Sequence, residues 1–256
     1  MSSVGKWYCI NLDSRPDRWS MAQLEFEKPG IQNKIERISA ISDAAISNSK
    51  MSRGEHGLIK TNLEIIKSAQ LIEHLCIFED DVTFLPEKTP AATLNAAGTQ
   101  LPSDWGLLYL GAHLFDRKVK HPLVSENLVR LLPEPKPSKK KDHVFVGGTH
   151  AIIFSQGARD FILNLNEKIF FEAQWDVFLS KYIIPQFPCF LVYPSFAFQR
   201  EDYSDLEGGE AKRNWIIEHN EGRIFPLESF EKTVSRGFFT TFRHSINKRL
   251  KSLMAK

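Results

Sequence analysis

The chain has 256 residues, of which 42% are hydrophobic and 25% charged, and its formal net charge is +2. This length allows one domain with a sizeable core, and the composition excludes general disorder. The small net charge argues against a nucleic-acid-binding protein that relies on bulk charge. Charged residues that serve a function must therefore be clustered at particular positions.

Neither a secretory signal nor a membrane span is expected from the sequence. The start, MSSVGKWYCI, has no basic stretch and no long apolar core. No apolar run reaches the ~18 residues that a membrane-spanning helix needs. Cys9, Cys76 and Cys189 lie far apart within apolar runs, which favours buried reduced thiols over a disulfide or a zinc site. We therefore expect a cytoplasmic protein.

The N-terminal part of the chain alternates strand and helix patterns. Residues 6–12 (KWYCINL) predict a short buried strand, and the turn DSRPDRW leads into helix formers that stop at Pro29 and Gly30. Between Leu58 and Leu75, apolar residues at intervals of three and four predict a helix that is buried over a wide face. The run 75–78 (LCIF) predicts the next strand.

Two further apolar runs, 105–111 and 150–155, predict more strands of the same sheet, and helical spacing follows in QGARDFILNL. Residues 133–143 are rich in Pro and Lys and predict a loop. Strands that alternate with helices predict an α/β fold with a mostly parallel central sheet flanked by helices.

The chain divides into a main domain, residues 1–230, and a basic amphipathic tail, residues 231–256. The tail contains apolar residues at intervals of three and four with basic residues between them: Phe239, Phe242, Ile246, Leu250 and Leu253. Two interpretations are open. The tail could contact an anionic membrane surface, or it could dock on the core with its basic face in water.

Three adjacent carboxylates, Glu79, Asp80 and Asp81, directly follow the buried run 75–78. Ligands of open α/β sheets gather at the carboxyl ends of strands. Carboxylates so close together repel one another, and a divalent cation relieves this repulsion; hard oxygen ligands suit Mg²⁺ or Mn²⁺. The alternative is an acidic turn or a helix cap that faces water.

Arg15 and Arg18 lie in the turn between the first strand and the first helix. Guanidinium groups and the backbone N–H groups of a helix N-terminus together bind anionic phosphate. A cation site and an arginine turn suggest a diphosphate between them. The alternative is a solvated turn with local Asp–Arg pairing.

Asp176 stands among Trp175, Val177 and Phe178. A carboxylate in apolar surroundings resists ionisation unless it has a partner, so Asp176 is either a helix cap or a tuned acid–base group. His150 could be a ligand or a core histidine, and we favour the core.

These motifs together resemble glycosyltransferase family 25, which includes bacterial lipooligosaccharide galactosyltransferases and collagen galactosyltransferases. The resemblance covers residues 6–180. The family opens with an Ile-Asn-Leu strand and a turn with Arg and Asp-Arg, followed later by an acidic motif and a Gly-Ala helix start. The matching residues are Ile10, Asn11, Leu12, Arg15, Asp17, Arg18, Glu79, Asp80, Asp81, Gly157 and Ala158.

The resemblance implies a GT-A-like domain that transfers a hexose, with inversion, from a nucleotide sugar to a hydroxyl of a glycan or glycolipid acceptor. It implies Mn²⁺ or Mg²⁺ at Asp80 and Asp81, and Asp176 is our candidate base. The predicted donor contacts are Asn11, Arg15, Arg18, Thr61, Asn62 and Glu79.

One departure concerns Thr61 and Asn62, which stand where the family commonly has a Ser-His pair. Their side chains offer a different hydrogen-bonding pattern, so the resemblance does not specify the donor. Two alternative functions stay open: a non-catalytic interaction protein of the same fold, and a metal-dependent phosphoesterase.

Overall fold

The computed structural model describes most of the predicted main domain. The described residues are 4–42, 51–69, 71–86, 91–115, 119–134, 145–200, 202–204, 209–211 and 223–226. The predicted tail and most of the predicted Pro- and Lys-rich loop lie outside them.

Strands and helices alternate along the first part of the chain, as predicted. The strands are β1 (Val4–Asn11), β2 (Ile35–Ser39), β3 (His74–Glu79), β4 (Val82–Phe84), β5 (Leu107–Tyr109), β6 (His113–Leu114), β7 (His121–Ser125), β8 (Leu128–Leu131), β9 (Val146–Gly147), β10 (Ala151–Ser155), β11 (Cys189–Val192), β12 (Ala197–Gln199), β13 (Asp202–Ser204), β14 (Gly209–Ala211) and β15 (Ile224–Pro226). The helices are α1 (Pro16–Glu27), α2 (Arg53–Ser68), α3 (Ala91–Thr99), α4 (Gln156–Leu163) and α5 (Trp175–Phe178). The described residues also form two 3₁₀ turns, Gln32–Lys34 and Glu167–Phe171, and a π-helical turn, Leu179–Ile183.

A nine-stranded sheet forms the centre, in the order β15-β7-β8-β11-β5-β10-β3-β1-β2. β10 runs antiparallel to its neighbours β3 and β5, and β8 runs antiparallel to β7 and β11, while the other pairings are parallel. Seven strands therefore point one way and two point the other, which confirms the predicted mostly parallel α/β sheet.

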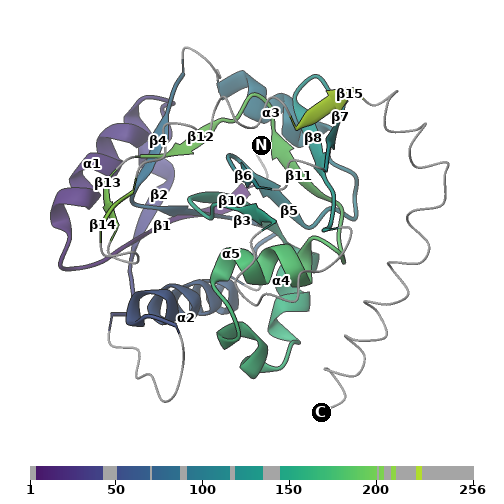
Figure 1. Cartoon of the computed structure of the whole chain (residues 1–256). Coiled ribbons are helices and arrows are strands. Elements are labelled where there is room, and N and C mark those ends of the chain that lie inside the picture. Colours follow the sequence, from purple (N-terminus) through teal and green to yellow (C-terminus); the bar gives the residue numbers. More distant parts are fainter. Residues whose placement is uncertain are drawn as a thin grey trace.

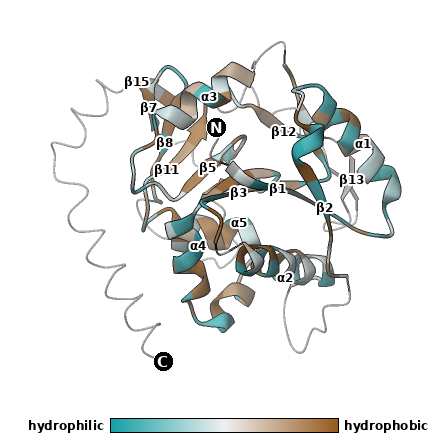
Figure 2. Ribbon diagram, turned by 180° about the vertical axis from the view of Figure 1, so that it is seen from behind, coloured by the Kyte–Doolittle hydropathy of each residue, from teal (hydrophilic) through white to brown (hydrophobic). Residues whose placement is uncertain are grey.

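Helices cover both faces of this sheet (Figure 1). α2, α4 and α5 pack on one face, where Tyr8, Ile77 and Tyr109 contribute strand residues to the core. α1 and α3 pack on the other face, against residues such as Cys9 and Phe78. The central strands are largely hydrophobic, whereas α2 carries both hydrophobic and hydrophilic residues, as expected for a helix on a sheet (Figure 2).

Local signals explain where the helices begin. Pro16 opens α1, where its missing N–H costs no hydrogen bond. Ser52 and Glu55 form a capping box at the start of α2, so this helix begins five residues before the predicted Leu58 and ends at Ser68. Ser155 caps α4 by accepting a hydrogen bond from the backbone N–H of Ala158.

Arg159 of α4 is fully buried and joins three segments at the amino end of β3. Its guanidinium donates to the backbone carbonyls of Ala69 and Ile72, and to that of Glu73 at 3.2 Å. Its Nε donates to the carbonyl of Ser155 at 3.3 Å. Burial lowers the pKa of Arg159, and these carbonyls compensate for the lost hydration of its charge.

The three cysteines, Cys9, Cys76 and Cys189, are free thiols and all are buried, as expected. Burial raises the pKa of each. Among the described residues, no helix has the length and apolar character needed to cross a membrane.

Candidate functional site

The three adjacent carboxylates separate at the carboxyl end of β3. Side chains of a strand alternate between the two faces of its sheet. Ile77 faces the α2 side and Phe78 the α1 side, so Glu79 returns to the α2 side. Asp80, just past the strand, contacts Arg18 of α1 on the opposite side.

Asp80 is 7% exposed, and each of its carboxylate oxygens has a partner. Oδ1 lies 2.5 Å from Nη2 of Arg18, and Oδ2 accepts a hydrogen bond of 2.7 Å from the side-chain amide of Asn11. Burial raises the pKa of Asp80, and the charge of Arg18 and the Asn11 hydrogen bond oppose this effect. Asp80 is therefore a fixed and largely enclosed carboxyl group.

Asp81 is arranged differently from Asp80. Its Oδ2 accepts a hydrogen bond of 2.8 Å from the amide of Gln199 and lies 3.4 Å from Nη2 of Arg18. Its Oδ1 is buried and makes no hydrogen bond within the part of the chain that the structure describes. A buried carboxylate oxygen without a donor is costly, and a cation would satisfy it.

Asn11, at the end of β1, organises the arginine turn. Its amide nitrogen donates to Asp80 and, at 3.0 Å, to the backbone carbonyl of Arg15. Its amide oxygen accepts a hydrogen bond of 2.8 Å from Arg37 of β2. Asn11 is 1% exposed, so it is a buried connector between β2, the arginine turn and the acidic turn.

Arg15 and Arg18 have different surroundings. Arg15 forms an ion pair of 2.9 Å with Asp17 of the same turn, as the solvated-turn alternative anticipates. Its charge nevertheless reaches Asp80, where it lowers the pKa of the carboxyl group against the larger effect of burial. Arg18 is buried and lies against the two aspartates.

The segment that contains β12 holds the acidic turn in place, and sequence reasoning missed it. Besides the Gln199 side chain, the backbone N–H of Arg200 donates to the carbonyl of Asp81 at 2.7 Å. Nη2 of Arg200 donates to the carbonyl of Asp80 at 3.3 Å. One sequence signal was available, since polar residues follow the apolar run 196–198 as they follow the run 75–78.

Glu79 belongs to a second polar group on the α2 side. The hydroxyl of Thr149 donates to its carboxylate, and its backbone N–H donates to the carbonyl of His150 at 3.0 Å. His150 is 1% exposed, which agrees with a core histidine. Its ring lies 5.8 Å from that of His113, whose Nε2 lies 3.4 Å from the amide oxygen of Gln199. Polar contacts thus extend from the acidic turn to His113.

Thr61 and Asn62 are buried in α2. The Thr61 hydroxyl accepts from the backbone N–H of Ile41 at 2.9 Å and donates to the carbonyl of Gly57 at 2.8 Å. The Asn62 amide donates to the carbonyl of Leu58 at 2.9 Å. The bond from Ile41 attaches α2 to the segment that follows β2, and the other two lie within the helix. A donor contact by either residue stays a prediction.

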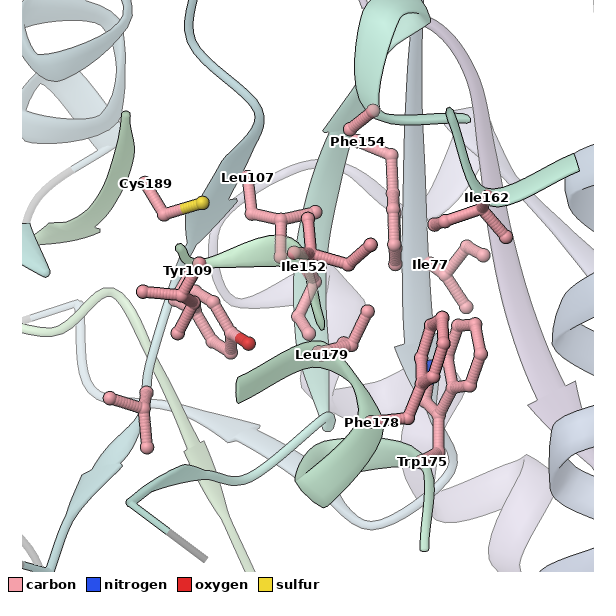
Figure 3. Close-up of a cluster of buried hydrophobic side chains, with 14 of the residues drawn as sticks. Ile77, Leu107, Tyr109, Ile152, Phe154, Ile162, Trp175, Phe178, Leu179 and Cys189 are labelled. Carbon is pink, nitrogen blue, oxygen red and sulfur yellow. The ribbon is translucent and has the colours of Figure 1, made fainter. Parts of the chain in front are cut away.

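Asp176 lies in the first turn of α5, on the side of the sheet that Glu79 faces. Trp175 and Phe178 of the same turn stack with ring centroids 5.0 Å apart and lie against Ile77 (Figure 3). The half-buried Asp176 carboxylate accepts from the backbone N–H of Val177 at 2.7 Å. Burial raises the pKa of Tyr109 at the end of β5, and the charges of Cys189 and Asp176 add to this effect. The Asp176 charge therefore acts on Tyr109, at the carboxyl end of β5.

The residues at the acidic turn fit one form of metal site and not another. Among the described residues, no group of three or more His, Cys, Asp or Glu side chains is placed to hold a metal ion. A closed site made of protein ligands alone therefore does not fit there. Mg²⁺ and Mn²⁺ sites that share their shell with substrate phosphates and water need one or two carboxylates. The Oδ1 of Asp81 fits that role, whereas both oxygens of Asp80 already have partners.

No protein-family model and no curated protein matches the chain. Among solved structures, one similar protein is a glycosyltransferase involved in the glycosylation of the major capsid of PBCV-1. It is 11% identical, with 73% of this chain and 79% of that chain covered and a TM-score of 0.38. A second is A197 from STIV, 11% identical, with 82% and 94% covered and a TM-score of 0.37. Likenesses this distant leave the function to be inferred from the site itself.

Proposed function

We propose that the protein is a GT-A-like glycosyltransferase. It transfers a hexose, galactose or glucose, from a nucleotide sugar to a hydroxyl of a glycan or glycoconjugate acceptor such as lipooligosaccharide. The configuration at the transferred carbon is inverted, and a UDP-sugar is the donor to test first. The resemblance of the acidic and arginine motifs to glycosyltransferase family 25 suggests this chemistry.

One observation carries the proposal. The acidic turn and the arginine turn, distant in sequence, meet at the carboxyl edge of the sheet, where Nη2 of Arg18 lies 2.5 Å from Oδ1 of Asp80. Ligands of α/β sheets bind at this edge. Cationic side chains and a divalent cation both stabilise a bound nucleoside diphosphate, and the two turns provide arginines and a carboxylate ligand side by side.

The chain's own residues divide the work of donor binding. Asp81 would hold Mn²⁺ or Mg²⁺ through Oδ1, and Asp80, fixed by Asn11, would keep Arg18 beside this site before the donor binds. Such an ion, when bound, neutralises the charge that builds on the departing nucleoside diphosphate. Arg15 and Arg18 bind the diphosphate itself, because guanidinium groups match phosphate oxygens in charge and geometry.

Asp176 is the candidate base on the acceptor side. Its carboxylate takes the proton of the acceptor hydroxyl while the hydroxyl oxygen forms a bond to the anomeric carbon and the bond from that carbon to the diphosphate breaks. Asp176 lies on the α2 side of the sheet, and the arginine turn lies on the α1 side. Donor phosphates and acceptor hydroxyl would then approach the sugar from different sides, as inversion requires.

The first experiment is calorimetric titration of the protein with UDP, with and without Mn²⁺. We expect UDP to bind when Mn²⁺ is present and to bind much more weakly without it. GDP and CMP are titrated in parallel to identify the nucleotide. If none of the three binds with Mn²⁺, the proposed function is wrong, and the non-catalytic alternative gains support.

Protein that binds UDP with Mn²⁺ is then incubated with UDP-galactose or UDP-glucose and a lipooligosaccharide acceptor. Transfer of radiolabelled sugar to the acceptor would establish the reaction, and the anomeric configuration of the product would test inversion. Co-sedimentation of the protein with vesicles that contain anionic lipids distinguishes the two interpretations of residues 231–256, contact with a membrane surface and docking on the core.

A further inference from the structure

Arg18 already occupies the position between the two aspartates. Its Nη2 lies 2.5 Å from Oδ1 of Asp80 and 3.4 Å from Oδ2 of Asp81. The exposed fractions of the three side chains are 9% for Arg18, 10% for Asp80 and 15% for Asp81. The guanidinium therefore neutralises part of the negative charge that a divalent cation would otherwise neutralise.

Each aspartate also has a second partner that is independent of Arg18. Asn11 donates to Oδ2 of Asp80 at 2.7 Å, and Gln199 donates to Oδ2 of Asp81 at 2.8 Å. These neutral amides hold both carboxyl groups in place even if Arg18 moves. Arg18 is thus the exchangeable partner of the pair, and Asn11 and Gln199 are the fixed ones.

A divalent cation at Oδ1 of Asp81 would place a second positive group a few ångströms from the Arg18 guanidinium. In a half-buried site with little water between them, the two cations repel each other. This repulsion is relieved if the Arg18 side chain moves away from the aspartates and pairs with another anionic group. Arg18 lies in the first turn of α1, and its guanidinium matches phosphate oxygens in charge and geometry.

We propose that Arg18 is the resident counter-ion of the Asp80–Asp81 pair and leaves it for the donor diphosphate when a divalent cation binds at Asp81. The cation and the nucleotide are then taken up together, and the cation alone binds poorly. This inference rests on the proposed function and adds an order of binding to it.

The test measures Mn²⁺ binding alone, from the electron paramagnetic resonance signal of free Mn²⁺, and repeats the titration with UDP. We expect Arg18→Met to bind Mn²⁺ alone about tenfold or more tightly than the unmodified protein, because the competing charge is gone. Arg18→Lys keeps the charge and should stay close to the unmodified protein. UDP should strengthen Mn²⁺ binding strongly in the unmodified protein and much less in Arg18→Met.

Arg15→Met is the matched control, because Arg15 lies in the same turn but pairs with Asp17. It should gain far less affinity for Mn²⁺ alone than Arg18→Met does. Circular dichroism establishes that each variant is folded. If Arg18→Met does not fold, Arg18→Gln removes the same charge with a polar side chain and takes its place in the comparison.

Two results would overturn the inference while the proposed function stands. In both, the unmodified protein binds UDP with Mn²⁺. Either folded Arg18→Met binds Mn²⁺ alone no more tightly than the unmodified protein, or Arg15→Met gains as much as Arg18→Met. Failure of the unmodified protein to bind any of the three nucleotides with Mn²⁺ would overturn the proposed function, and the inference with it.

Discussion

Two buried arginines lie at opposite ends of β3, and their partners differ in kind. Arg159, at the amino end, donates to backbone carbonyls of Ser155, Ala69, Ile72 and Glu73. Arg18, at the carboxyl end, lies against two carboxylates. Carbonyls belong to the folded backbone and cannot be exchanged for a ligand, whereas a carboxylate can exchange one cation for another.

The comparison suggests that one end of the strand serves stability and the other serves binding. A buried cation that donates to backbone carbonyls fixes the junction of α2, β3 and α4. A buried cation between carboxylates keeps a charged site compact until another positive group arrives. Substitutions at the amino end should therefore change the free energy of unfolding, and substitutions at the carboxyl end should change nucleotide binding.

The largest effect on stability is expected at the amino end. Arg159→Met removes the donor shared by the carbonyls of Ala69, Ile72 and Glu73 and should lower the free energy of unfolding by about 1 to 3 kcal/mol, measured by urea denaturation. Arg53→Met is the control, because Arg53 is exposed in the first turn of α2. It should change the free energy of unfolding by less than about 0.5 kcal/mol. Equal losses in the two variants would contradict the structural role of Arg159.

Asp176→Asn tests the acceptor side of the site. The amide cannot accept the proton of the acceptor hydroxyl, so transfer should fall about 10²- to 10⁴-fold. Binding of UDP with Mn²⁺ should not change, because Asp176 lies on the side of the sheet away from the arginine turn. If this variant loses UDP binding instead, Asp176 is a donor or metal contact and not the base.

Asp81→Ala tests the carboxyl end directly. The variant loses the oxygen proposed to hold the cation, so calorimetry should show Mn²⁺-dependent UDP binding weakened by at least about 100-fold. The urea midpoint should stay near that of the unmodified protein, since Asp81 lies beyond the end of β3 and is half-buried. Asp104→Ala removes an exposed carboxylate elsewhere and should bind UDP normally; unchanged binding in Asp81→Ala would refute the metal assignment.

Gln199→Leu should give the smallest effect. Asp81 keeps its charge but loses the amide that orients Oδ2, so Mn²⁺-dependent UDP binding should weaken about 10-fold. Gln199→Asn retains the amide on a shorter side chain and should recover part of the affinity. If Gln199→Leu and Gln199→Asn bind UDP with Mn²⁺ equally well, the amide does not orient Asp81.

Much of the fold follows from local patterns in the sequence. The apolar runs around Ile10, Ile77 and Ile153 predicted strands of one sheet, because their side chains could be buried only between two layers. The apolar spacing did not determine the helix boundaries, since α2 begins where the Ser52–Glu55 capping box places it. The apolar spacing alone also gave no strand directions, so β10 could not be identified as running antiparallel.

The sequence by itself determined that carboxylates and arginines follow buried strands, and therefore that they lie at the carboxyl edge of a sheet. Only the tertiary structure decided how they combine. The pleat sends Glu79 to one face, and contacts across 69 residues to Asn11 and 118 residues to Gln199 fix Asp80 and Asp81 on the other. Such pairings depend on strand order and on which helix covers which face, and no local pattern specifies either.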